Sequence, residues 1–154
     1  MIARANDSNR SLLLILPSER RLHPLAPVAL TRAQSSRRRL RNAYADALLL
    51  DDDGHVRRFE HIEVLGPWGD SFGRKVLSRL TDAWNIRVTL SNPLPLTLVE
   101  LKKLIADCAV DSTGDDSAGV FTAEALAGAS SASTGKGVLD ALDLPPPEEA
   151  LDVL

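Results

Sequence analysis

The chain has 154 residues, of which 44% are hydrophobic, 25% are charged and only 4% are aromatic. This composition is typical of a globular protein with room for one ordinary domain and a mainly aliphatic core. The single cysteine, Cys108, excludes an internal disulfide framework and a multi-cysteine zinc site within one chain. The apolar run at residues 12–16 is too short for a secretory leader or for a membrane span of about 20 residues, so we expect no membrane association.

Charge is distributed unevenly along the chain. Residues 1–41 hold nine Lys/Arg against two Asp/Glu, residues 42–110 hold eight against ten, and residues 111–154 hold one against nine. The net charge of −3 therefore hides a basic start, a balanced middle and an acidic end. The excess of arginine over lysine, with abundant alanine and leucine, favours a bacterial cytoplasmic protein. The basic, serine-containing start leaves the mitochondrial matrix as the alternative compartment.

Residues 1–28 are predicted to form an extended basic arm. The apolar run at 12–16 indicates a short strand within it, and three prolines then keep the chain extended. Between residues 30 and 48 the apolar positions recur at helical spacing, which predicts a helix capped by Thr31. The water-facing sides of this helix and the flanks of its apolar stripe carry five arginines: Arg32, Arg37, Arg38, Arg39 and Arg41.

Residues 47–65 predict a β-hairpin. Its centre, Asp53-Gly54, is a strong turn signal because both residues tolerate positive φ. In the second strand the alternation of apolar and polar residues breaks between Phe59 and Ile62. We therefore expect either a β-bulge or a partly buried second face at that point.

The segment after the hairpin predicts a helix, a strand and a second helix. Residues 71–84 form the cleanest amphipathic helical pattern, and residues 85–90 alternate as a half-buried strand does. Thr97 and Glu100 have the spacing of a capping box, which marks the start of the second helix. Cys108 falls on the apolar stripe of that helix, which indicates a small core residue and not a reactive thiol.

These elements predict an α+β fold: a small antiparallel, strongly bent sheet, barrel-like at the limit, with two or three amphipathic helices. We place a single α+β domain at residues 29–110. Residues 111–154 are acidic and rich in Ser, Gly and Pro, so we expect a disordered tail that cannot offset the entropy of ordering. A core confined to residues 43–110 would supply only about 3 to 5 kcal/mol, so the arm or a second chain must pack on it.

Three sequence patterns come near to known sites without fitting them. The acidic run at residues 51–53 lacks the Gly and Glu spacing of a calcium loop, which leaves a solvated hairpin turn. Residues 134–137 lack the spacing and the Ser or Thr of a phosphate loop. His55 and His61 could act as general bases, but no nucleophile accompanies them in a recognisable motif. We expect no metal, no cofactor and no catalysis, and keep an enzyme that uses one of these histidines as an alternative.

The arginine cluster is the one functional candidate with a physical mechanism, because guanidinium groups pair with phosphates and carboxylates. It can offset the acidic tail in cis, meet an acidic protein, or make phosphate contacts to nucleic acid. Our leading hypothesis is a non-catalytic, self-associating protein-interaction module. The alternative is a sequence-nonspecific nucleic-acid-associated protein with an autoinhibitory acidic tail. The candidate interaction surface is Arg32, Arg37, Arg38, Arg39, Arg41 and Trp68, where Trp68 either anchors an interface or folds over the sheet.

Overall fold

The computed structural model describes residues 11–42, 44–67, 83–109, 121–150 and 152–154. Within these stretches all the strands and α2 come first along the chain, and α4, α5 and α6 follow; two short 3-10 helices are labelled η1 and η2. The elements are β1 (Leu12–Leu16), β2 (Arg21–Leu25), η1 (Pro27–Thr31), β3 (Arg32–Gln34), α2 (Arg37–Asn42), β4 (Leu48–Leu50), β5 (Val56–Pro67), β6 (Ala83–Leu90), α4 (Leu98–Ala109), α5 (Ala123–Ser131), α6 (Gly135–Ala141) and η2 (Pro147–Glu149).

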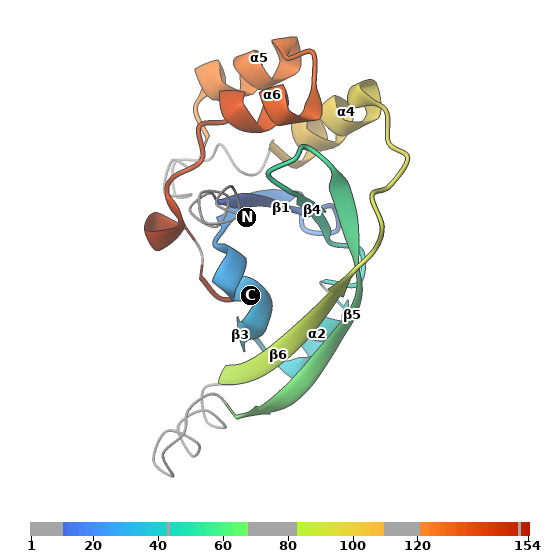
Figure 1. Ribbon diagram of the computed structural model, residues 1–154, viewed down its shortest axis with the longest axis vertical. Coiled ribbons are helices and arrows are strands. Elements are labelled where there is room, and N and C mark those ends of the chain that lie inside the picture. Colours follow the sequence, from blue (N-terminus) through green and yellow to red (C-terminus); the bar gives the residue numbers. More distant parts are fainter. Residues whose placement is uncertain (1–10, 43, 68–82, 110–120, 151) are drawn as a thin grey trace, which may run out of the picture.

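Six strands form one antiparallel sheet in the order β2-β1-β4-β5-β6-β3. The sheet curls strongly. Its long strands β5 and β6 extend away from the helices and bend towards β3 (Figure 1). Helices α4, α5 and α6 gather at one end, beside β1 and β4 (Figure 1). The structure thus confirms the predicted α+β fold with a small, strongly bent antiparallel sheet that forms a half-barrel.

Strand β1 is buried on both faces. Because successive side chains of a strand point to opposite faces, its apolar run divides between two hydrophobic clusters. Leu12, Leu14 and Leu16 lie in the half-barrel cluster, whereas Leu13 and Ile15 lie in the cluster under the helices. The strand predicted in the basic arm is therefore an interior strand of the sheet, paired with β2 on one side and β4 on the other. It supplies the packing that residues 43–110 lack on their own.

The hairpin and its bulge are confirmed. Strands β4 and β5 pair in antiparallel register, and Gly54 at the turn has a φ of 83°. The pairing of β5 with β6 shifts between Phe59 and His61, which leaves one extra residue on β5. This bulge lets Phe59 and Ile62, three positions apart, both pack in the half-barrel cluster.

Helix α4 begins as its sequence predicts. The Thr97 hydroxyl oxygen accepts a hydrogen bond from the Glu100 amide at 3.2 Å, and the Thr97 hydroxyl donates to the Glu100 carboxylate at 3.1 Å. Cys108 is buried in the cluster under the helices, as expected. Burial raises the pKa of its thiol, which keeps it protonated and unreactive near neutral pH.

The helix predicted over residues 30–48 is wrong in its extent. The segment forms the end of η1, the strand β3 and a six-residue helix α2 that starts at Arg37. The Thr31 hydroxyl donates to the Val28 carbonyl oxygen at 2.7 Å and caps no α-helix, while the Ser36 hydroxyl oxygen accepts from the Arg39 amide at 3.1 Å. Pairing of β3 with the distant strand β6 outweighs the local helical pattern.

The helix predicted at residues 71–84 falls largely on residues 68–82, which lie outside the described part of the chain. Its last two positions, Ala83 and Trp84, belong to strand β6 and pair with β3. The predicted strand over residues 85–90 is confirmed as the remainder of β6.

The acidic segment differs from the expected disorder wherever the structure describes it. Helices α5 and α6 begin at threonine caps, because the Thr122 and Thr134 hydroxyl oxygens accept from the amides of Ala125 and Gly137. The apolar side chains of α5 and α6 pack in the cluster under the helices, where Leu139 is 1% exposed. The pattern that came near to a phosphate loop is thus the start of α6.

Candidate interaction cleft

A cleft of about 610 Å³ opens between α2 and β5. Its floor is apolar and comes from both the helix side and the sheet, while its rim carries charged side chains from α2 and from the bulge of β5. The cleft is lined by Arg37, Leu40, Arg41, Tyr44, Ala45, Phe59, Glu60, His61, Ile62 and Val64.

Two local features of the sequence build this cleft. The Ser36 cap starts α2 so that Arg37 and Arg41, four residues apart, lie on the same face while Leu40 is buried in the core. On the opposite wall the bulge of β5 turns Ile62 towards the half-barrel interior and leaves Glu60 and His61 exposed. The cleft therefore combines two guanidinium groups, one carboxylate and one imidazole over an apolar floor.

Arg37 is held in place by an aromatic ring. Its guanidinium carbon lies 4.7 Å from the centroid of the Trp84 ring, within the range of a cation–π interaction. No ion pair joins Arg37 or Arg41 to a carboxylate in the described part of the chain. Within those residues neither charge is neutralised by an ion pair, and the Trp84 ring already orients Arg37.

Arg39 serves the fold instead. Its guanidinium group makes two hydrogen bonds, of 2.8 and 3.1 Å, to the carboxylate of Glu19 in the β1–β2 turn, and lies 5.8 Å from the Tyr44 ring centroid. The hydrogen bonds to Glu19 raise the pKa of Arg39. Because the pair is solvent-exposed, it contributes at most about 1 kcal/mol. Arg39 therefore links α2 to the sheet.

The remaining residues of the predicted surface are scattered. Arg38 is exposed on α2, away from the cleft lining, and Arg32 lies half-buried on β3. Trp68 lies outside the described residues, so its two predicted placements stay predictions. The structure thus brings together Arg37 and Arg41 from the arginine cluster, and places them in one cleft with residues of β5 that sequence spacing alone did not indicate.

The two candidate catalytic histidines are separated. His61 and Glu60 both line the cleft, but no hydrogen bond joins their side chains and both are exposed. Serine, threonine and cysteine are absent from the described residues that line the cleft, so no nucleophile of that kind stands beside His61. His55 lies apart, at the hairpin turn.

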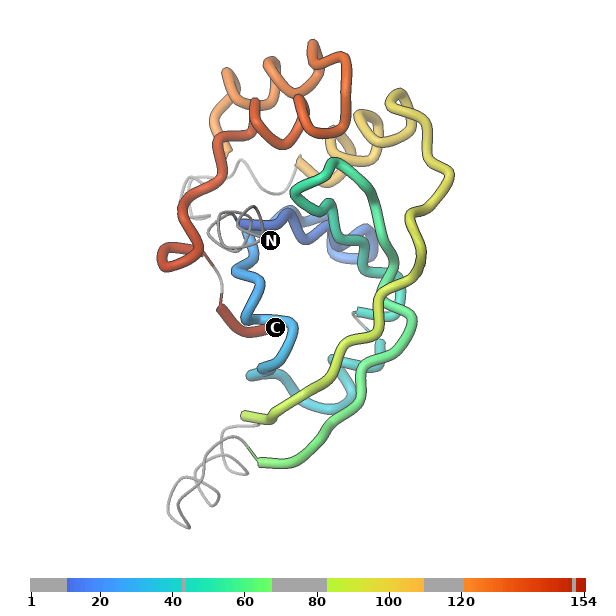
Figure 2. Tube along the Cα trace, in the orientation of Figure 1, coloured from blue at the N-terminus to red at the C-terminus, as the bar shows by residue number. Residues whose placement is uncertain are grey.

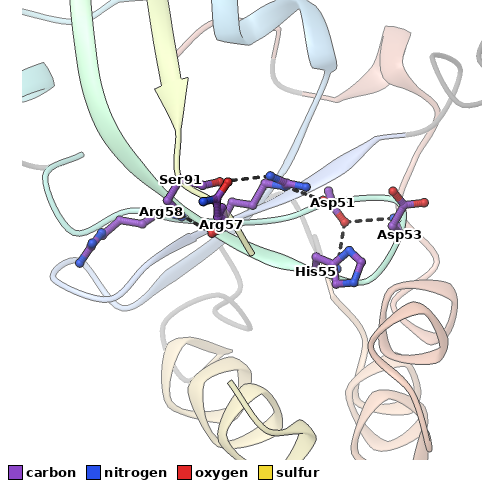
Figure 3. Close-up of polar contacts among 7 residues, drawn as sticks. Asp51, Asp53, His55, Arg57, Arg58 and Ser91 are labelled. Atoms are coloured by element: carbon purple, nitrogen blue, oxygen red, sulfur yellow. Dashed lines mark hydrogen bonds and ion pairs between the residues drawn. The ribbon is translucent and has the colours of Figure 1, made fainter. Parts of the chain in front are cut away.

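That turn is a hydrogen-bonded network around Asp51 (Figure 3). One carboxylate oxygen accepts from the amides of Asp53 and His55 at 3.0 and 2.9 Å, and the other accepts from Arg57 Nε at 3.0 Å. Arg57 also donates to the Ser91 carbonyl oxygen at 3.1 Å. The side chains of Asp51, Asp53 and His55 place potential ligand atoms within 4.8 Å of one another. Both carboxylate oxygens of Asp51 already accept hydrogen bonds that stabilise the turn. These hydrogen bonds explain why the three side chains lie close together.

A second cavity, of about 310 Å³, lies among α4, α5 and α6. Its walls are mainly apolar, with Ile105, Leu126 and Val138 among them, and Lys102 and Ser130 contribute the polar atoms. Sequence reasoning missed this cavity because two of its three helices fall in the segment expected to be disordered. The threonine caps before α5 and α6 were the local signal that could have indicated them.

The chain matches no known protein family, no curated protein and no solved structure. Among the described residues, every helix is too short or too polar to cross a membrane. A proposal of function therefore rests on the side chains of the cleft and on the sheet that carries them.

We expect the stability of the protein to depend on pH because of His23 on β2, which lies near the Arg39–Glu19 pair. Burial lowers the pKa of His23 below 6.5, Arg21 and Arg39 lower it further, and Glu19 opposes them. The unfolded chain then binds more protons below about pH 6.5, so stability is complete above that pH and falls as the pH drops through it.

The test is urea unfolding at pH 7.5 and pH 5.5. The His23→Gln variant should lose less stability on acidification than the wild type, whereas the exposed-site control His55→Gln should behave like the wild type. An equal loss in the wild type and in His23→Gln would contradict this origin of the pH dependence.

Proposed function

We propose that this protein is a non-catalytic, self-associating interaction module of the bacterial cytoplasm, and that its cleft binds an acidic, partly apolar segment of a protein partner. The observation that carries the proposal is the pair Arg37 and Arg41, which stand without carboxylate partners in the described chain at the rim of an apolar floor. A carboxylate of the partner would meet the guanidinium groups while an aliphatic side chain next to it covers the floor.

The chemistry of the cleft suits such a segment. Hydrogen bonds between guanidinium and carboxylate groups are short and strong, and arginine is enriched at the energetically important positions of protein interfaces. The Trp84 ring holds Arg37, so less side-chain freedom is lost on binding. The buried thiol of Cys108 and the single-cysteine composition fit a reducing compartment.

Nucleic acid fits the same surface less well. Arg39 is already paired with Glu19, which leaves fewer guanidinium groups of α2 for phosphate contacts. Tyr44 is 4% exposed, so its ring offers no platform on which a base could stack. Among the described acidic residues near the end of the chain, Glu148, Glu149 and Asp152 form no ion pair with the arginines of α2.

The proposal is tested with labelled peptides that mix Asp or Glu with Leu, against all-acidic and all-apolar peptides, by fluorescence anisotropy. We expect the mixed peptides to bind best. The double variant Arg37→Glu/Arg41→Glu should bind them at least about tenfold more weakly, as the loss of two charge-assisted contacts requires.

The control is Arg58→Glu, which makes one Arg→Glu substitution at an exposed arginine of β5 outside the cleft lining. It should change the affinity by less than about twofold. Stronger retention of random DNA than of any peptide at low salt would favour the nucleic-acid alternative. Equal binding of mixed peptides by the double variant would refute the cleft as the site.

A further inference from the structure

Residues 152–154 lie along the outer edge of the half-barrel. The Leu154 amide donates to the Arg32 carbonyl oxygen at 3.1 Å, and the Leu154 carbonyl oxygen accepts from the Gln34 amide at 2.9 Å. The Ser35 hydroxyl donates to the same carbonyl oxygen at 3.0 Å. Leu154 thus bonds to Arg32 and Gln34, two alternate residues of β3, which is the hydrogen-bond pattern of parallel strands. Strand β6 occupies the other side of β3.

The side chain of Leu154 anchors this contact. It is 3% exposed and belongs to the half-barrel cluster together with Ala29 and Ala33. Its neighbours in sequence, Asp152 and Val153, are exposed and half-buried. The segment therefore docks through main-chain hydrogen bonds and one apolar side chain, and these contacts do not depend on which copy of the chain supplies them.

The connection to the rest of the fold is a proline-rich spacer. Three prolines at residues 145–147 follow α6 and prevent the helix from continuing, and η2 is one short turn. The Ser11 hydroxyl donates to the Pro145 carbonyl oxygen and holds the start of the spacer. Beyond it, the described residues up to 153 are exposed or half-buried. Of the described residues at 146–150 and 152–154, only Leu154 is a buried member of a hydrophobic cluster, so this segment can leave the sheet while the other described cluster members stay in place.

The two edges of the sheet differ in what they offer to another strand. At one edge, β2 carries Pro24, which lacks the amide that a further strand would need. At the other edge, β3 presents main-chain groups that already pair with Leu154. Figure 2 shows the end of the chain beside the blue segment that carries β3. The β3 edge is therefore the edge suited to strand addition.

We propose that the β3 edge is a strand-addition site and that two copies of the chain exchange residues 146–154, each docking Leu154 on β3 of the other. The occupant is a second copy because its segment is identical to the one that already fits, and reciprocal exchange closes a two-fold dimer without any new surface. This inference rests on the self-association in the proposed function and names its structural basis. It does not depend on the cleft.

The test measures the mass of the full chain by light scattering over a wide range of protein concentration. The wild type and the exposed-site control Val99→Asp should dimerise with rising concentration, while Leu154→Asp should remain a monomer. A dimer that persists in Leu154→Asp would overturn the exchange and leave self-association standing. A wild type that stays monomeric at every concentration would overturn both, and peptide binding at the cleft would be measured separately.

A second measurement guards against a variant that simply misfolds. A labelled peptide of residues 146–154 should bind the chain that lacks residues 152–154 at least about tenfold more tightly than the same peptide carrying Leu154→Asp. Equal binding of the two peptides, or no binding of either to a variant with wild-type circular dichroism, would overturn the strand-addition site.

Discussion

The Leu14→Ala variant should unfold with a free energy about 2 to 5 kcal/mol lower than that of the wild type. Leu14 is 0% exposed and lies between His23 of β2 and Leu49 of β4, so no neighbour can easily close the cavity that the substitution leaves. Urea unfolding followed by circular dichroism measures the difference.

The matched control is Val99→Ala on α4, where the side chain is 75% exposed and the change should stay within about 0.5 kcal/mol. A loss below about 1 kcal/mol in Leu14→Ala would contradict the placement of β1 in the interior. It would mean that residues 12–16 of the extended arm do not pack into the sheet.

The Gly135→Ala variant should lose about 1 to 3 kcal/mol of unfolding free energy, the usual cost of forcing extra atoms into a packed site. A Cβ atom at Gly135 would overlap the carbonyl oxygen of Gly54, and one at Gly54 would lie 2.8 Å from the carbonyl carbon of Gly135. The hairpin turn and the start of α6 therefore meet backbone to backbone. Gly54→Ala should cost more still, because Gly54 also has a φ of 83°.

Gly66→Ala provides the matched control, since a Cβ there meets nothing within 4 Å. It should change stability by less than about 0.5 kcal/mol. Hydrogen exchange would show whether the amides of α6 lose protection in Gly135→Ala. Unchanged stability and unchanged exchange would mean that α6 does not pack on the hairpin turn.

The fold could be predicted where local chemistry decides the structure. The Asp53-Gly54 turn, the broken alternation before Ile62 and the Thr97 cap each act over a few residues, and the structure confirms all three elements. The segment at residues 30–48 failed because β3 forms only through pairing with β6, some fifty residues away. Helices α5 and α6 are too short to be stable alone, so these segments become helical only by packing their apolar side chains together on α4.

The candidate site, too, could be predicted from the sequence only where neighbouring residues decide it. The sequence marks the arginine cluster, and the four-residue spacing places Arg37 and Arg41 together. It gives no sign that Arg39 pairs with Glu19, which lies twenty residues earlier in the chain. The apolar floor of the cleft also depends on the bulge of β5, and the role of the Trp84 ring under Arg37 depends on the pairing that brings β6 to β3.

The double burial of β1 has a consequence for cooperativity. If the helices separated from the sheet, Leu13 and Ile15 would meet water while Leu14 still held the half-barrel together, and the strand would lose half of its support. Neither cluster can therefore open without weakening the other. We expect one thermal transition instead of two, with amides of β1 and of α4 exchanging at similar free energies of opening.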